Sequence, residues 1–305
     1  MPFDSQKDIT REEQISSSLA RIMDFPGMDD IKQTVRRWEI LRKNIGRIPP
    51  EAPVLLPEYL WVSKSGTGKT EMLHLIADYL DAAQLMPFNG LVKVIEYTMD
   101  YCDPDQHFGQ LEDLIDALSA SSGYHNEFKG ILALNIDAWL EHLEEKHFVE
   151  LLEFISDHNR SLLLILIVWP DDRYLDQLES MLSVYLRISR IVIELPSAEV
   201  MIAFIEDRLS AYKCRMADET RSMLLDTISA VRDLDGFDGY KTLEFMAQDI
   251  VYNYYCSENA VSGLIGPEHI SKYLDTASIS HIFKERYDKK RDMRIMAGFH
   301  PGSRG

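Results

Sequence analysis

The chain has 305 residues, enough to bury a sizeable core, and its 46 % apolar and 27 % charged residues exclude a disordered or fibrous protein. Its 50 acidic and 32 basic residues give a formal net charge of −18, a field that repels phosphodiester backbones and anionic lipid surfaces. Nucleic acid is therefore not expected as the main partner, and the one basic segment, 284–294, is explained as a solvated helix end.

Two amphipathic helices are the first predicted elements. Thr10 and Glu13 form a capping box that opens the first helix, which carries apolar residues at helical spacing. The second helix begins at Asp29 and stops before the proline-rich segment 48–57, which we expect to be a connecting loop. We assign residues 1–22 to an N-terminal helix that precedes the core.

The middle of the chain alternates short apolar runs with longer amphipathic stretches. The runs predict five strands, at 59–62, 91–97, 130–136, 162–169 and 190–195. The first four are mostly apolar on both faces, as strands of a buried parallel sheet should be. The stretches between them predict helices, at 69–83, 109–120 and 139–159. This repetition predicts an α/β core over residues 23–196, a parallel sheet flanked by helices.

The pattern after Pro196 is helical throughout. Apolar residues recur at helical spacing in four segments, 197–211, 218–231, 241–255 and 267–276. We therefore predict a small all-helical domain over 197–288, followed by a flexible tail at 289–305.

A glycine-rich loop directly follows the first predicted strand. Its residues are Ser63, Lys64, Ser65, Gly66, Thr67, Gly68, Lys69 and Thr70. They match the phosphate-binding pattern GxxxxGK followed by Ser or Thr at every position except the first glycine. The alternative, a glycine-rich turn with a chance lysine, is disfavoured by the strand, loop and helix context.

The chemistry of this loop points to a nucleoside triphosphate. Gly66 and Gly68 let the backbone curl so that its amide N–H groups point inward, and the helix beginning at Lys69 adds the positive end of its dipole. In this pattern Lys69 bridges the β- and γ-phosphates and Thr70 coordinates Mg²⁺. We therefore predict that the chain binds ATP with Mg²⁺.

Together with segment 26–35, the loop resembles the AAA+ ATPases, most closely the Rubisco-activase-like CbbX (CfxQ) type and the sporulation SpoVK type. The resemblance spans residues 23–255. It implies a P-loop core followed by a helical lid domain, and a subunit that forms a ring or filament. It also implies that the chain associates with itself or with a related AAA+ subunit, and that nucleotide state drives remodelling of a protein partner.

The resemblance assigns further roles by position. Arg190, in a Ser-Arg-Ile triplet before the last core strand, corresponds to the arginine finger that reaches a neighbouring subunit's γ-phosphate, with Arg187 in reserve; ordinary ion pairing is an equal alternative. Lys241 stands where the family has a sensor-2 arginine, with a surface lysine as the alternative. Tyr101 or Phe108 corresponds to the aromatic pore loop, or packs against the following helix.

The strand that ends in Asp-Glu in the family departs most from the pattern. If Asn135 takes the place of the aspartate, Mg²⁺ binding is weakened; if Asp137 does, Ala138 replaces the glutamate that polarises water. A third register puts Asp137 in the place of the glutamate. Parity and strand length favour the first register, and sequence identity favours the other two, in both of which Asp137 is the candidate catalytic and metal residue. At the end of the next strand, Asp171 is the nearest polar substitute for the sensor-1 residue.

Cellular location is predicted from the cysteines and the apolar runs. Cys102, Cys214 and Cys256 form no CxxC motif or Cys/His cluster, which is typical of thiols in a reducing compartment. The N-terminus lacks the pattern of a signal peptide, and the longest apolar run, 162–169, is too short to span a bilayer. We expect a cytoplasmic protein without a membrane anchor.

Three functions follow from these patterns. The first is an AAA+ ATPase with weak hydrolysis that couples nucleotide state to assembly or remodelling. The second is a pseudo-ATPase that binds ATP structurally and supports an active AAA+ partner. The third, a P-loop kinase, is disfavoured by the helical domain after Pro196.

Overall fold

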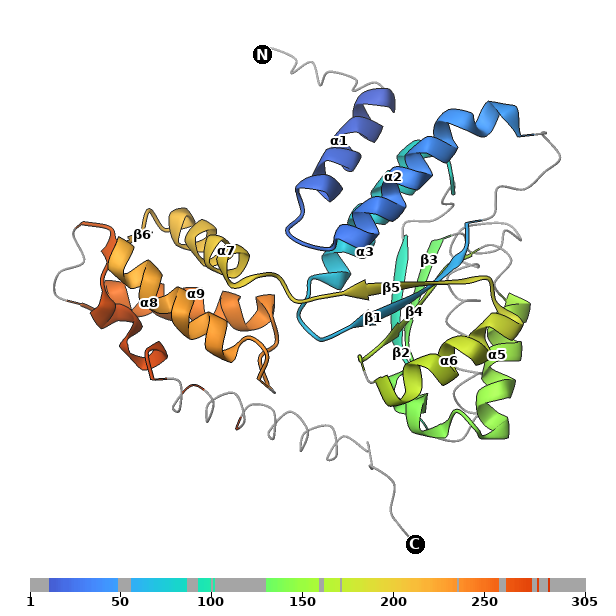
Figure 1. The fold of residues 1–305 in the computed structure, drawn as a ribbon. Helices are drawn as coiled ribbons and strands as arrows, with labels where there is room; N and C mark the ends of the chain where they lie inside the picture. Colours follow the sequence, from blue (N-terminus) through green and yellow to red (C-terminus); the bar gives the residue numbers. More distant parts are fainter. Residues whose placement is uncertain are drawn as a thin grey trace, which may run out of the picture. The chain divides into compact units, whose positions relative to one another are not determined.

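The computed structural model describes residues 11–48, 56–86, 93–99, 101, 130–158, 162–170, 172–234, 236–257, 262–275, 279 and 285. The chain divides into two compact units (Figure 1). The first comprises Met1–Ser63 and Lys69–Ile193, and the second comprises Lys64–Gly68 and Glu194–Gly305. The middle of the glycine-rich loop therefore groups with the C-terminal unit.

The first unit is built on a five-stranded parallel sheet. Its strands are β1 (Glu58–Ser63), β2 (Val94–Thr98), β3 (Gly130–Asn135), β4 (Leu162–Val168) and β5 (Ile188–Ile193). They follow the order β2-β3-β4-β1-β5, so β1 lies between β4 and β5. The loop after β1 opens at the carboxyl edge of the sheet, which is where α/β proteins bind their ligands.

Helices cover both faces of this sheet (Figure 1). On one face lie α1 (Arg11–Asp24), α2 (Asp29–Asn44) and α3 (Lys69–Ala83), with the short η1 (Ile45–Arg47) after α2. On the other lie η2 (Asp137–His142), α5 (Lys146–His158) and α6 (Asp172–Tyr185). Side chains alternate between the faces along each strand, so Ile131 and Ala133 pack with α3 while Leu132 and Leu134 pack with α5.

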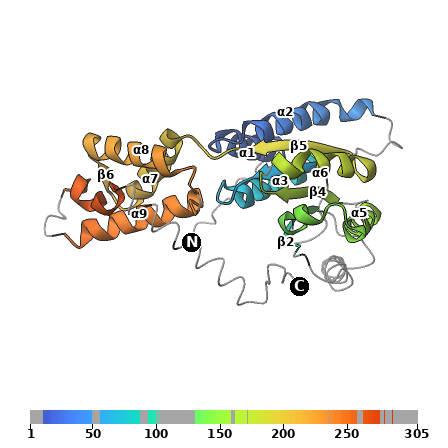
Figure 2. The same ribbon diagram turned by 60° about the horizontal axis from the view of Figure 1, so that its bottom comes forward.

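The second unit is mainly helical (Figure 2). It contains α7 (Ala198–Ala211), α8 (Asp218–Val231), α9 (Tyr240–Tyr255) and η4 (Pro267–Tyr273). Its core is apolar and includes Ile205, Leu224 and Ile250. The all-helical prediction missed a two-stranded parallel ladder between β6 (Arg215–Met216) and β7 (Leu264–Ile265), because two-residue strands leave no readable alternation.

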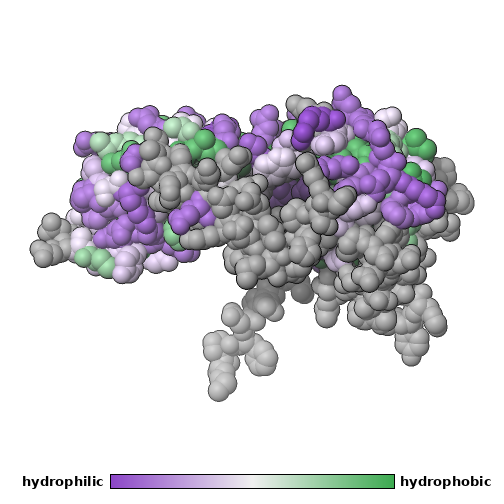
Figure 3. All heavy atoms as spheres, turned by 90° about the horizontal axis from the view of Figure 1, so that it is seen from below, coloured by the Kyte–Doolittle hydropathy of each residue, from purple (hydrophilic) through white to green (hydrophobic). Residues whose placement is uncertain are grey.

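The surface is polar on the face that can be viewed, and the described cysteines are unpaired by disulfides. On the face seen in Figure 3, the described residues are mostly hydrophilic, with smaller apolar areas between them. No helix among the described residues has both the length and the apolar composition needed to cross a membrane. Cys214 is buried and Cys256 is exposed, and both are free thiols; Cys102 lies outside the described residues.

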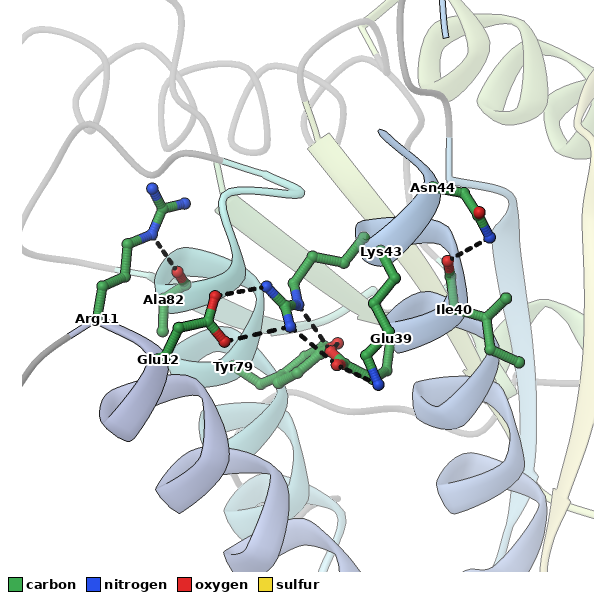
Figure 4. Close-up of polar contacts among 9 residues, drawn as sticks. Arg11, Glu12, Glu39, Ile40, Lys43, Asn44, Tyr79 and Ala82 are labelled. Atoms are coloured by element: carbon green, nitrogen blue, oxygen red, sulfur yellow. Dashed lines mark hydrogen bonds and ion pairs between the residues drawn. The ribbon is translucent and has the colours of Figure 1, made fainter. Parts of the chain in front are cut away.

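A polar cluster joins the three helices on one face of the sheet. Figure 4 shows Glu12 of α1, Glu39 of α2 and Tyr79 of α3 pointing toward one another. Arg42 forms a two-pronged pair with Glu39, at 2.9 and 3.0 Å, and its Nη1 lies 3.0 Å from Oε1 of Glu12. The Tyr79 hydroxyl donates to Glu39 at 2.9 Å. The Arg42 hydrogen bonds lower the pKa of Glu39 from its ordinary 4.5 to about 2, although burial opposes the shift.

Replacing Glu39 with glutamine is expected to destabilise the fold by about 2 kcal/mol at neutral pH, since charge-assisted hydrogen bonds contribute about that much. Because the folded pKa lies below the unfolded one, this contribution is present above about pH 5 and is lost as the pH falls toward 2. Urea unfolding of wild type and E39Q from pH 7 to pH 2 measures it. A difference that does not shrink with falling pH would contradict the assignment, and E141Q, at an exposed glutamate, is the control.

Candidate functional site

The glycine-rich loop has the predicted strand, loop and helix context. β1 ends at Ser63 and α3 begins at Lys69. Gly66 and Gly68 have φ angles of +75° and +90°, a region that residues with a Cβ rarely adopt. Ser63, which stands at the first glycine of the motif, pairs with Ile193 as the last residue of β1, so serine is accommodated there in extended backbone.

Lys69 of the loop forms a hydrogen bond with Ser63. The Nζ atom of Lys69 donates a hydrogen bond to Oγ of Ser63 at 3.2 Å. The Ser63 side chain is buried, so its hydroxyl is a fixed partner at the start of the loop. The departure from the motif therefore supplies a side-chain acceptor for Lys69, and this acceptor holds the ammonium group beside the N-terminus of α3.

Thr70, the last residue of the loop, has an acidic partner. Oγ1 of Thr70 donates to Oε2 of Glu96 at 2.9 Å, and both side chains are exposed. Glu96 lies in β2, two residues before its end. Sequence reasoning missed this residue, although a glutamate inside a mostly apolar predicted strand was a signal that could have drawn notice.

β3 ends in an amide side chain, and a carboxylate follows two residues later. Asn135 is the last residue of β3 and shares a face with Ile131 and Ala133, the face covered by α3. Asp137 follows the strand as the first residue of η2. Asn135 therefore faces α3 from within the sheet, whereas Asp137 lies beyond the end of the strand.

Asp137 is tied to the ends of two neighbouring strands. Its Oδ2 accepts from Nδ2 of Asn135 at 2.9 Å, and its backbone N–H donates to Oδ1 of Asn135 at 3.0 Å. Its Oδ1 accepts from the backbone N–H of Trp169, the residue after β4. The carboxylate therefore links the ends of β3 and β4 at the carboxyl edge of the sheet. Asp171, the proposed sensor-1 substitute, lies outside the described residues.

Arg190 lies within a strand rather than before it. β5 begins at Ile188, two residues earlier than predicted, so Arg190 is its third residue and pairs with Leu60 of β1. Its Nη1 lies 3.5 Å from Oε2 of Glu179 on α6, and both side chains are partly exposed, so the pair contributes little to stability. The backbone N–H of Arg187 donates to Glu58 at 2.9 Å.

Within the second unit, the start of α9 contacts the middle of the loop. The backbone N–H of Tyr240 donates to the carbonyl of Gly66 at 2.8 Å. A Cβ at Gly66 would overlap the carbonyl of Asp238, and one at Gly239 would overlap the carbonyl of Gly66. Lys241 follows directly, exposed in the first turn of α9. Its backbone is thus one residue away from the contact with the loop.

Tyr101 packs within the first unit. Its ring stacks on His142 with centroids 3.5 Å apart and meets Trp139 edge-on at 5.2 Å. Its hydroxyl donates to Glu145. The aromatic residue proposed for a pore loop therefore covers η2 in this structure, and Phe108 lies outside the described residues.

No protein-family model matches the chain, and no curated protein does. Solved structures match along most of its length. The Thermotoga maritima RuvB Holliday junction branch migration motor has a TM-score of 0.53 at 12 % identity, covering 83 % of this chain and 72 % of that one. The FIGL-1 AAA domain has a TM-score of 0.51 at 13 % identity, covering 95 % and 98 %.

A point mutant of Thermotoga maritima RuvB gives a TM-score of 0.51 at 13 % identity and covers 93 % of this chain and 81 % of that one. The chain has the AAA+ fold. The predicted fold class, a P-loop parallel sheet flanked by helices, is thereby confirmed. At identities of 12–13 % the likeness establishes the AAA+ fold alone, and the function has to be argued from the site.

Proposed function

We propose that the protein is an ATP-binding AAA+ subunit that couples nucleotide state, with weak hydrolysis, to the assembly or remodelling of a protein partner. The observation that carries this proposal is the loop Ser63–Thr70, which joins a central strand of an AAA+ fold to the N-terminus of α3. Gly66 and Gly68 have the positive φ angles that such a loop needs. The likeness to AAA+ structures supports the same proposal.

The residues of the loop fit a bound triphosphate. The first amide groups of α3 have no partner within the helix, and with the helix dipole they favour an anion at this end. Lys69 adds a positive charge, and Ser63 holds it at the loop in advance. Mg²⁺, when bound, neutralises phosphate charge; the Thr70 hydroxyl would be one of its ligands.

Hydrolysis is proposed to be slow because of the carboxyl end of β3. Asn135 is neutral, so it supplies no charge to the cation. Asp137 is the candidate to polarise water, but its carboxylate accepts bonds from Asn135 and from the Trp169 amide. It would have to exchange these bonds before acting as a base. The same observation favours the second candidate function, a pseudo-ATPase that binds ATP to support an active AAA+ partner.

We further propose self-association, with Arg190 as the arginine finger toward a neighbouring subunit and Lys241 as the residue that senses nucleotide from the lid. Both arise from the sequence resemblance, as does the CbbX or SpoVK type. Arg190 is only weakly engaged with Glu179, which leaves its guanidinium open to exchange partners. Lys241 begins the helix that touches the loop in the second unit.

A protein, rather than a nucleic acid, is proposed as the partner. Thermotoga maritima RuvB is a Holliday junction branch migration motor, but the net charge of −18 on this chain opposes binding to phosphodiester backbones. A cytoplasmic location is proposed from the cysteine pattern.

Native mass spectrometry with ATP, with ADP and without nucleotide tests the assembly proposal. We expect larger particles with ATP than without nucleotide, because a nucleotide that binds the assembled state better shifts the equilibrium toward it. Steady-state phosphate release, measured on the same samples, separates the two functions. The same particle size in all three conditions contradicts nucleotide-driven assembly, whereas assembly without turnover supports the pseudo-ATPase.

A further inference from the structure

We infer that Glu96 of β2 supplies the carboxylate of the magnesium site, since Asn135 is neutral and brings no negative charge to that site. The inference rests on the proposed function, because it needs a bound Mg·ATP. It changes the metal assignment made from sequence, which paired Thr70 with Asp137.

The first argument is the hydrogen bond between Thr70 and Glu96. A hydroxyl has one proton to donate and two lone pairs to offer. Because Oγ1 of Thr70 donates its proton to Oε2 of Glu96, at 2.9 Å, its lone pairs remain available to a cation. A carboxylate acceptor makes this bond charge-assisted and fixes the hydroxyl in that orientation. Glu96 thus prepares Thr70 to act as a ligand and brings a negative charge to the same point.

The second argument is the register of the sheet. Val94 packs with the cluster on the α3 face and Ile95 with the cluster on the opposite face. Because side chains alternate along a strand, Glu96 and Thr98 belong to the α3 face. Their partners on β3 are Ala133 and Asn135. Glu96 therefore stands one strand away from the expected position of the aspartate, on the same face, beside a small alanine.

The third argument is the supply of charge. Mg²⁺ in nucleotide sites is usually held by one or two carboxylates, by substrate phosphates and by retained waters. Both carboxylate oxygens of Asp137 already accept hydrogen bonds, one from Asn135 and the other from the Trp169 amide. Glu96 has an exposed side chain, so a hydrated cation can approach it. Among the described residues, Glu96 is the carboxylate that accepts a hydrogen bond from Thr70 of the phosphate loop.

The test is the Mg²⁺ dependence of binding of a fluorescent ATP analogue, titrated from EDTA to millimolar Mg²⁺. We expect E96Q to bind the analogue in EDTA at least as well as wild type, since the variant removes a negative charge near the phosphates. We expect it to need at least about ten-fold more Mg²⁺ for half-maximal enhancement, because even the loss of a group that only supports a metal ligand costs about 10–100-fold in metal affinity. Electron paramagnetic resonance of Mn²⁺ in the ternary complex gives a second readout that does not depend on turnover.

Two further variants make the result specific. E71Q removes the same charge from the residue next to Thr70, in the exposed first turn of α3, and should leave the Mg²⁺ titration unchanged. N135D in the E96Q background restores a carboxylate on the same face of the sheet and should recover most of the lost Mg²⁺ affinity. Circular dichroism melting of each variant shows that the fold is retained.

The outcomes separate the inference from the function on which it rests. If the wild type binds the analogue and E96Q titrates like the wild type and E71Q, the assignment of Glu96 is wrong while ATP binding stands. If E71Q loses Mg²⁺ affinity as much as E96Q does, the effect is general charge and the assignment is again overturned. If the wild type does not bind the analogue at any Mg²⁺ concentration, the proposed function fails and the inference fails with it.

Discussion

Replacing Lys69 with alanine is expected to lower the affinity for ATP by about 100-fold or more. The proposed contacts of the ammonium group are charge-assisted hydrogen bonds to two phosphates, each contributing about 1.5–3 kcal/mol, and each 1.4 kcal/mol corresponds to about ten-fold in affinity. The fold should persist, because the hydrogen bond from Lys69 to Ser63 is lost without opening the core. Isothermal titration calorimetry with ATP in the presence of Mg²⁺ measures the change.

The matched control is K146A, which removes the same charge from α5 at a side chain that is 84 % exposed. Its affinity for ATP should equal that of wild type. An unchanged affinity in K69A would mean that the glycine-rich loop does not bind ATP, and the central proposal would fall. K69A also gives the background for turnover: wild-type phosphate release no faster than that of K69A identifies a pseudo-ATPase.

The sheet could be predicted because its strands are buried on both faces. β1, β3 and β4 are nearly continuous apolar runs, so their positions can be read from the sequence without knowing their neighbours. β5 was placed two residues too late. It is an edge strand, and its first half, with Ser189 and Arg190, is polar and partly exposed, so only its pairing with β1 defines where it begins.

The partners of the loop could not be predicted in the same way. The strand, loop and helix pattern is local, and eight consecutive residues carry it. The bond from Thr70 to Glu96 depends on where α3 lies across the sheet, and the bond from Tyr240 to Gly66 joins residues far apart in sequence. No periodicity encodes such contacts. The face on which Asn135 lies could be predicted, unlike these contacts. Side chains alternate between the two faces along β3, so the face follows once the end of the strand is known.

Replacing Gly239 with alanine is expected to destabilise the protein by about 3 kcal/mol. Gly239 has φ +50° and ψ −127°, a region whose cost for other residues is about 1–3 kcal/mol. An added Cβ would also overlap the carbonyl oxygen of Gly66 and stand 3.2 Å from Cδ2 of Leu195. Relief of that overlap would open the hydrogen bond from Tyr240 to Gly66, which adds about 1 kcal/mol.

Urea unfolding followed by circular dichroism measures this change, with G27A as the control. Gly27 has a comparable φ of +72°, but nothing lies within 4 Å of the Cβ position, so G27A reports backbone strain alone. G66A is expected to open the same contact, because its Cβ would overlap the carbonyl of Asp238. Since both variants break the same contact, the double variant G66A/G239A should lose less stability than the sum of the losses in the two single variants. Equal costs for G239A and G27A, or strict additivity in the double variant, would mean that the loop and the start of α9 are not packed backbone against backbone.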